Sequence, residues 1–214
     1  MPATIADIRK NYSQKKLSEK KADANPMKQF AKWWKQAVDS KIDEVNAMTL
    51  ATASATGMPS ARIVLLKSVS ADGFIFFTNY NSHKGKELEE NPFACLVFFW
   101  KELERQIRIT GTIEKVSAAE SDEYFHSRPV GSRIGAWASP QSSVITSRET
   151  IEANIVKYEQ EFAGTEITRP PHWGGYIVRP TLIEFWQGRP NRLHDRLQYS
   201  KLQSDMWNIE RLAP

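Results

Sequence analysis

The chain has 214 residues, 41% of them hydrophobic and 11% aromatic, which is enough apolar material for a sizeable core and a ligand site. This composition excludes a disordered chain, and the single cysteine, Cys95, excludes an intramolecular disulfide, a multi-cysteine zinc site and a CxxC redox pair. The 29 Lys and Arg against 25 Asp and Glu give a net charge of +4, which suits phosphorylated ligands or nucleic acid without choosing between them.

The sequence predicts a cytoplasmic protein. A lone cysteine fits a reducing compartment. The longest apolar run, 93–100, is far shorter than the roughly 20 residues of a membrane-spanning helix. Residues 1–24 lack the apolar core of a secretory signal, so we expect no targeting segment and no membrane association.

Residues 1–24 are polar and rich in lysine, which predicts a mobile N-terminal arm, with a solvated tail of no function as the alternative. Residues 25–214 are expected to form a single domain. At its start, Phe30, Trp33, Trp34 and Val38 recur at helical spacing after Pro26 and predict a helix.

The next part of the chain has the pattern of an antiparallel meander. Strands are expected over 48–54, 62–67 and 74–78, with turn signals between them, and again over 94–100 and 106–113. A short helix is expected over 82–90, because Asn91 and Pro92 end its pattern.

The second half predicts two helices and a final group of strands. Ser117 to Glu120 has the form of a capping box and begins a helix that ends before Pro129, and a helix from Thr146 to about Phe162 follows a loop containing Gly131 and Gly135. Strands are expected over 175–178, 182–186 and 192–197, the last paired with 207–212. Together these elements predict a mainly β protein, a closed or nearly closed antiparallel barrel with peripheral helices.

Common short motifs of enzyme sites are absent from the sequence: it has no GxGxxG, GxxxxGK[ST], HExxH or GxSxG. The four histidines share no spacing typical of a metal site, so we expect no metal. They are His83, His126, His172 and His194.

The first candidate site is the segment from Arg192 to Arg196. On a strand, Arg192, His194 and Arg196 would share one face, where three cationic or potentially cationic groups repel each other unless an anion joins them. The pattern indicates a phosphate or flavin site, and a solvated edge strand is the structural alternative.

The second candidate lies at the end of the helix before Pro129. Tyr124 and Arg128 are four residues apart on one helix face, and Ser132 follows in the predicted glycine-bearing loop. A guanidinium, a phenol and a hydroxyl form a plausible monophosphate pocket, whereas an arginine capping the helix C-terminus is the structural alternative.

The third candidate combines Arg62 and Lys67, which bracket an apolar strand, with Lys84 in the first turn of the helix begun by Ser82, where the dipole favours an anion. Five positions apart, Arg62 and Lys67 face opposite sides of a regular strand, so either the strand bends or they serve different ligand groups. Neutral groups suited to a heterocycle's amide edge are Gln106, Gln141 and Ser142.

These segments together resemble the pyridoxamine 5′-phosphate oxidase family, in order from about Ile8 to the C-terminal end of the sequence. The blocks YFHSRP (124–129) and RLHDR (192–196) are highly specific together. The other matching segments are RIVLLK (62–67), LERQ (103–106), IGAW (134–137), QSS (141–143), WGG (173–175) and EFWQG (184–188).

The resemblance implies an FMN-binding split β-barrel, a homodimer with FMN at the subunit interface, and oxidation of pyridoxamine or pyridoxine 5′-phosphate to pyridoxal 5′-phosphate. A hydride equivalent passes from substrate C4′ to flavin N5, and oxygen takes the electrons to give hydrogen peroxide. By the family pattern the substrate contacts are Lys67, Tyr124, Arg128, Ser132, Arg9 and Tyr12, with Arg192 and His194 at the reacting carbon. The FMN contacts are Arg62, Ile63, Val64, Leu65, Lys67, Phe77, Thr78, His83, Lys84, Gln106, Gln141, Ser142, Trp186 and Arg196.

One position departs from the family pattern. Members often have Ser-Arg-Lys where this chain has Ser82-His83-Lys84, which predicts weaker and more pH-sensitive FMN binding, because imidazole lacks the bidentate fork. Two other interpretations remain: a split-barrel flavoprotein with another substrate or without turnover, and a basic nucleic-acid-binding module. No RNP-like or helix-turn-helix pattern supports the second, so we expect no nucleic-acid partner.

Overall fold

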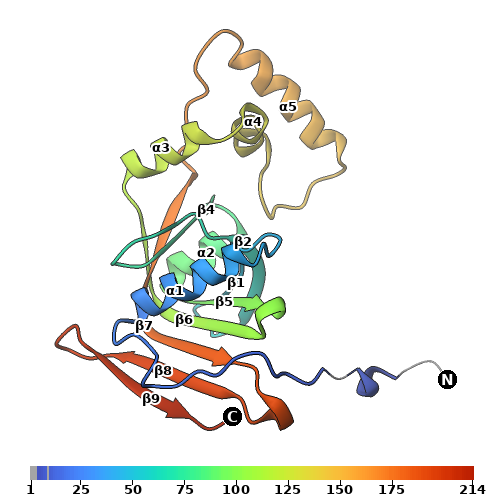
Figure 1. Cartoon of the computed structure of the whole chain (residues 1–214). Coiled ribbons are helices and arrows are strands. Elements are labelled where there is room, and N and C mark those ends of the chain that lie inside the picture. The colour runs from blue at the N-terminus through green and yellow to red at the C-terminus, as the bar shows by residue number, and fades with distance from the viewer. Residues whose placement is uncertain (1–3, 9) are drawn as a thin grey trace. The chain divides into compact units, whose positions relative to one another are not determined.

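The computed structural model describes residues 4–8 and 10–214, and Figure 1 shows its elements. The strands are hydrogen-bonded in the order β2-β1-β5-β6-β7-β4-β3, with β8 paired to β7 and β9. Within the described residues the strands are β1 (Ala47–Ala53), β2 (Pro59–Leu65), β3 (Ser68–Val69), β4 (Phe74–Asn79), β5 (Phe93–Trp100), β6 (Arg105–Lys115), β7 (Trp173–Gln187), β8 (Asp195–Lys201) and β9 (Trp207–Leu212). The helices are α1 (Pro26–Asp39), α2 (His83–Glu90), α3 (Ala118–Ser127), α4 (Val130–Ala138) and α5 (Glu149–Glu161), with short 3-10 turns η1 (Ile5–Asp7), η2 (Lys101–Leu103) and η3 (Pro190–Arg192).

The chain forms two compact units. One, here called the terminal unit, contains the segment up to Thr49, Cys95–Thr110 and Pro180–Pro214. The other, the central unit, contains Leu50–Ala94 and Gly111–Arg179. The prediction of one domain over 25–214 stays a prediction. None of the helices in the described ranges is long and apolar enough to cross a membrane.

In the terminal unit, α1 forms where the apolar spacing predicts it. Asn25 caps the helix by accepting hydrogen bonds from the backbone N–H groups of Met27 and Lys28, and Pro26 occupies its first turn. Phe30 is 1% exposed and Trp33 4%. Their rings pack in the core of this unit, where the Trp33 ring lies 5.2 Å from that of Phe185. Val38, by contrast, is 47% exposed and lies off the buried face.

The arm makes specific contacts within the terminal unit. The backbone N–H groups of Ser13 and Gln14 both donate to the buried carboxylate of Glu104, at 2.9 and 3.1 Å. Further along, the N–H of Leu17 donates to Asp195 at 3.1 Å. These bonds dock this stretch of the arm, and the mobility of residues 1–24 stays a prediction.

In the central unit, β4 pairs antiparallel with the first half of β7, in a register that sets Phe77 opposite Gly175. A Cβ atom on Gly175 would lie 2.6 Å from a methyl group of Val116 and 2.8 Å from the Phe77 ring. Only glycine therefore fits where this strand passes so close to its neighbours.

The predicted loop between the two helices is wrong: residues 130–138 form α4. Ile134, Ala136 and Ala138 on this helix are buried, and the first two belong to a core cluster with Phe125 and Trp173. Burial of this face outweighs the helix penalty of Gly131 and Gly135, which is about 1 kcal/mol each. Ser132 therefore lies in the first turn of a helix and not in an open loop.

The predicted strand 192–197 begins too early. Pro190 starts the turn η3, and Asn191 and Arg192 have φ angles of 55° and 61° in the left-handed region. Since β8 starts only at Asp195, Arg192 and His194 precede the strand, and the expected shared strand face with Arg196 is wrong. The pairing of this region with β9 is confirmed.

Two smaller differences concern element ends. The expected strands 175–178 and 182–186 are one continuous strand, β7. Helix α5 has Arg148 at its N-cap with no side-chain cap, whereas Thr146 was expected to begin it. Ser117 does cap α3, by accepting a hydrogen bond from the N–H of Glu120 at 3.1 Å.

Candidate functional site

A cleft of about 630 Å³ in the central unit gathers most of the predicted site residues. Its walls come from β2, β4, α2, α3, α4 and the segment after α4. Twelve predicted residues line it: Arg62, Ile63, Val64, Leu65, Lys67, Phe77, Thr78, Lys84, Tyr124, Arg128, Ser132 and Gln141. Because β2 ends at Leu65, Lys67 lies beyond the regular strand, and it lines the same cleft as Arg62.

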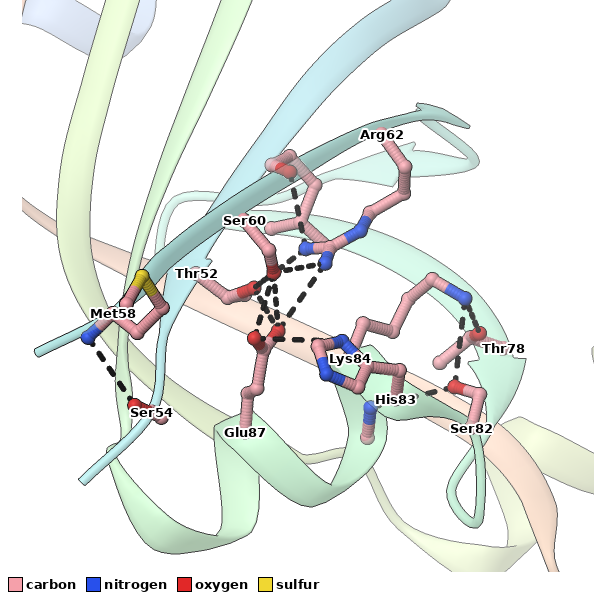
Figure 2. Close-up of polar contacts among 12 residues, drawn as sticks. Thr52, Ser54, Met58, Ser60, Arg62, Thr78, Ser82, His83, Lys84 and Glu87 are labelled. Carbon is pink, nitrogen blue, oxygen red and sulfur yellow. Dashed lines mark hydrogen bonds and ion pairs between the residues drawn. The ribbon is translucent and has the colours of Figure 1, made fainter. Parts of the chain in front are cut away.

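Lys84 is a buried ammonium with neutral partners. Its side chain is aimed at Thr78 and Ser82 (Figure 2), and Nζ lies 3.3 Å from Thr78 Oγ1, 3.4 Å from Ser82 Oγ and 3.3 Å from Gln141 Oε1. Among the described residues no carboxylate forms an ion pair with it. Burial, and next the nearby charge of Arg62, lower the pKa of Lys84. Such a cation at the wall of a cleft is suited to an anionic ligand group.

Arg62 is held by a polar cluster behind the cleft wall, shown in Figure 2. Its Nη1 donates to the carbonyl of Leu50 at 3.3 Å and to the hydroxyl of Thr52. Its Nη2 donates to the hydroxyl of Ser60 and to Glu87 Oε2, the latter at 3.2 Å. The guanidinium is thus fixed by groups from β1, β2 and α2.

Arg128 carries a buried polar atom without a partner. Over the described part of the chain, its Nη1 has no hydrogen-bond acceptor. The guanidinium lies 4.5 Å from the centre of the Trp173 ring. Burial lowers the pKa of Arg128, and the neighbouring Tyr124 partly opposes this. An unpaired donor of a cation at a cleft wall fits an anion that would complete its hydrogen bonds.

The cleft also has an aromatic wall. The rings of Phe77 and Tyr124 stack with centroids 4.0 Å apart, and Phe77 stacks on Trp173 at 5.5 Å. Lys67 Nζ lies 5.8 Å from the centre of the Tyr124 ring. Flat apolar surfaces next to cations suit a phosphorylated ring compound.

A second group of predicted residues lies in the terminal unit, around His194. Its ring is 4.5 Å from that of Trp186 and 6.0 Å from that of Tyr12. The backbone N–H of Arg189 donates to His194 Nδ1 at 3.1 Å. Burial, and then the charge of Arg192, lower the pKa of His194, so the neutral ring with its proton on Nε2 is favoured.

The remaining predicted residues have varied surroundings. Arg196 donates to the buried Glu184 at 2.7 Å, and this bond raises the pKa of Arg196. Gln106 is half-buried on β6. Ser142 is exposed beside Gln141, and His83 faces Glu87 and not the cleft, with Nδ1 3.5 Å from Glu87 Oε1. Arg9 lies outside the described residues.

Sequence reasoning missed Glu87 and Trp173 as parts of this site. Trp173 lines the cleft and packs on Arg128, and in the sequence only the WGG segment of the family resemblance points to it. Glu87 follows Lys84 by three positions and His83 by four, a helical spacing that could have indicated a shared face.

Comparisons with known proteins match this arrangement. The family described as "Pyridoxamine 5'-phosphate oxidase" matches residues 34–162, and the "Pyridoxine 5'-phosphate oxidase C-terminal dimerisation region" matches 173–214. A pyridoxine/pyridoxamine 5′-phosphate oxidase of Cyanothece sp. is 61% identical over 214 residues, and one of Trichormus variabilis is 56% identical over the same length; each comparison covers 100% of both chains.

Solved structures agree. PhzG from Burkholderia lata 383, in complex with tetrahydrophenazine-1-carboxylic acid, has a TM-score of 0.87 at 31% identity, covering 94% of this chain and 100% of PhzG. A pyridoxamine 5′-phosphate oxidase-related, FMN binding protein from Nostoc punctiforme has the same fold, with a TM-score of 0.70 at 16% identity, covering 88% of this chain and 98% of that one. The expected fold class is confirmed.

The chain therefore belongs to the pyridoxamine 5′-phosphate oxidase family of split-barrel oxidoreductases. It is an enzyme of that family, and its activity is that of a pyridoxine/pyridoxamine 5′-phosphate oxidase. The binding roles of the individual residues stay predictions.

Proposed function

We propose that the enzyme uses FMN to oxidise pyridoxamine and pyridoxine 5′-phosphate to pyridoxal 5′-phosphate, with oxygen as the acceptor and hydrogen peroxide as the second product. The observation that carries the substrate class is Arg128, whose buried Nη1 has no partner among the described residues. Tyr124 and Ser132 line the same cleft. These three groups match the needs of a phosphate monoester.

The residues also fit FMN. The buried Lys84, whose partners are neutral oxygens, suits the flavin's phosphate, with Arg62 on the same cleft. Thr78 and Gln141 are the neutral groups beside it. When bound, FMN supplies the electron sink for a hydride equivalent from the substrate's C4′.

The chain's own residues would bind and orient the substrate. We assign its phosphate to Arg128, Tyr124 and Ser132, and the positioning of its reacting carbon to Arg192 and His194. Because Nδ1 of neutral His194 accepts the Arg189 N–H, its Nε2–H is free to donate a hydrogen bond. His194 would then hold the substrate's amine nitrogen or alcohol oxygen, and would not act as the base that removes a proton from it.

A homodimer with the site at the subunit interface is part of the proposal. The match of residues 173–214 to a dimerisation region supports a dimer. Exposed apolar side chains in and beside the predicted site also support it: Ile63 in the cleft wall is 66% exposed, and Leu193 next to Arg192 is 68% exposed. Sedimentation at several protein concentrations tests this part. We also propose a cytoplasmic location, because the single cysteine, Cys95, fits a reducing compartment.

PhzG raises a second candidate class of substrate, because its bound ligand carries a carboxylate and, by its name, no phosphate. An arginine donor suits a carboxylate as well as a phosphate. We prefer the phosphorylated substrate because relatives at 61% and 56% identity are named pyridoxine/pyridoxamine 5′-phosphate oxidases, whereas PhzG is 31% identical.

The test is an absorbance spectrum of the purified protein, followed by anaerobic addition of pyridoxine 5′-phosphate. We expect a flavin band that bleaches with substrate and returns in air. A flavin band that bleaches only with a non-phosphorylated substrate would contradict the substrate class, and a protein that binds no added FMN would contradict the cofactor.

A further inference from the structure

Glu87 is a buried carboxylate that does not line the cleft. It is 5% exposed and extends from α2 towards Thr52, Ser60 and Arg62 (Figure 2). The Thr52 hydroxyl donates to it at 2.6 Å, the Ser60 hydroxyl at 2.7 Å, and Arg62 Nη2 at 3.2 Å.

This carboxylate is ionised at neutral pH. Burial raises the pKa of Glu87, but the hydrogen bonds from Ser60 and Thr52 and the charges of His83 and Arg62 outweigh burial, so that the pKa is lowered overall. A full negative charge therefore lies directly behind Arg62.

The position of this charge has a cost for anion binding. Arg62 and Lys84 are the two cations of this part of the cleft, and Glu87 is ion-paired with Arg62. Both terminal nitrogens of Arg62 already donate within the cluster. A phosphate at this wall meets a guanidinium whose charge is largely neutralised, and it also experiences the field of Glu87 itself.

We propose that Glu87 is the counter-ion that limits how strongly this cleft prefers a phosphorylated flavin to an unphosphorylated one. The proposal rests on FMN as the ligand. It assigns Glu87 no contact with the ligand; the residue acts through charge, on Arg62 and on the phosphate. Glu87 therefore has two opposing effects: it holds Arg62 in place, and its charge weakens the cleft's attraction for phosphate.

The test is Glu87→Gln, which keeps the shape and a hydrogen-bond acceptor for Arg62 but removes the charge. The dissociation constants of FMN and riboflavin are measured by flavin fluorescence quenching, and their ratio isolates the phosphate. We expect the preference for FMN to rise by about ten-fold, the order expected for one unit charge several ångströms away in a partly desolvated site. Glu90→Gln is the matched control on the same helix, because Glu90 is exposed, and it should change the ratio less than about two-fold.

A pair of variants separates charge from mere positioning and remains informative if Glu87→Gln does not fold. Arg62→Gln leaves Glu87 without its arginine partner, whereas Arg62→Gln with Glu87→Gln removes both charges of this pair. We expect the double variant to prefer FMN about ten-fold more strongly than Arg62→Gln alone. If Glu87 only positioned Arg62, the two would have equal ratios.

An unchanged or lower FMN preference in Glu87→Gln, or equal ratios in the pair, overturns this proposal while the wild type still binds FMN. A wild type that binds neither flavin instead overturns the proposed cofactor, so the two failures are distinguishable.

Discussion

Replacing Arg128 with methionine tests the substrate site most directly. Methionine keeps much of the apolar stem that packs near Trp173 and removes the guanidinium. A hydrogen bond to a charged group contributes about 1.5–3 kcal/mol. Loss of the phosphate's contacts to this cation should therefore raise the KM for pyridoxine 5′-phosphate by roughly 10- to 150-fold, at about 1.4 kcal/mol per factor of ten.

The same substitution should leave stability nearly unchanged. Within the described residues Arg128 Nη1 has no partner to lose, and the buried charge is relieved of its desolvation cost. The contact with the Trp173 ring is the main loss, about 0.5–1 kcal/mol. We expect a thermal midpoint within a few degrees of wild type, because the lost ring contact is small and the relieved desolvation cost opposes it.

The assay is oxygen uptake at varied substrate concentration, with FMN affinity measured separately. Arg148→Met is the control, because Arg148 is an exposed arginine paired with Glu152, and its KM should equal that of wild type. The reasoning is refuted if Arg128→Met keeps a KM within three-fold of wild type, or if its main effect is loss of FMN.

Three further substitutions test other parts of the molecule. Arg192→Gln should lower kcat by more than ten-fold with a smaller change in KM, because Arg192 is assigned to the reacting carbon; steady-state kinetics with full turnover would contradict it. Gly188→Ala places a Cβ 2.7 Å from the Tyr12 ring, so it should displace the docked arm and speed hydrogen exchange around Tyr12, which unchanged exchange would disprove. Arg211 lowers the pKa of Glu19 from 4.5 to about 2, so ionised Glu19 stabilises the fold above about pH 4.5 and this contribution disappears as the pH falls towards 2. Glu19→Gln should accordingly lower the thermal midpoint slightly at pH 6 and not at pH 2. A variant whose midpoint equals that of wild type at both pH values would contradict this prediction.

The sequence predicts most elements because their periods are regular. Alternation over β1, β5 and β6 and the helical spacing of α1 each reflect one buried face. Local rules failed where tertiary packing overrides them. Two glycines suggested a loop over 130–138, yet burial of Ile134 and Ala138 makes that segment a helix.

The sequence also does not predict an unusual backbone conformation at a residue type that rarely adopts it. Arg192 adopts a left-handed φ of 61°, which is uncommon for arginine, and a strand pattern read through it placed three cations on one face. Pro190 gave a signal against the strand, since it favours the start of a turn.

In the cleft, too, residues close together in the sequence are easier to predict as neighbours than residues far apart. Tyr124, Arg128 and Ser132 are close in sequence, and the prediction that they share a site agrees with the cleft they line. The expected common helix face of Tyr124 and Arg128 is wrong, because α3 ends at Ser127 and Arg128 follows it in an extended conformation. Glu87 binds Thr52 and Ser60, which lie 35 and 27 residues away, and no spacing rule links them. The charge that balances Arg62 becomes visible only when β1, β2 and α2 have been placed together.

The charges of the cleft explain why its cations differ in how they are held. Arg62 has an ion pair, and with it a defined orientation that does not depend on ligand. Lys84 and Arg128 have no carboxylate partner among the described residues, and burial lowers the pKa of both. Burial without a counter-ion is costly, so these two gain most from a bound anion. Each lines the cleft, but they contact different neighbours, Lys84 the hydroxyl of Thr78 and Arg128 the ring of Trp173. Two cations without a carboxylate partner, in different surroundings, would suit the two phosphorylated ring compounds of the proposed function.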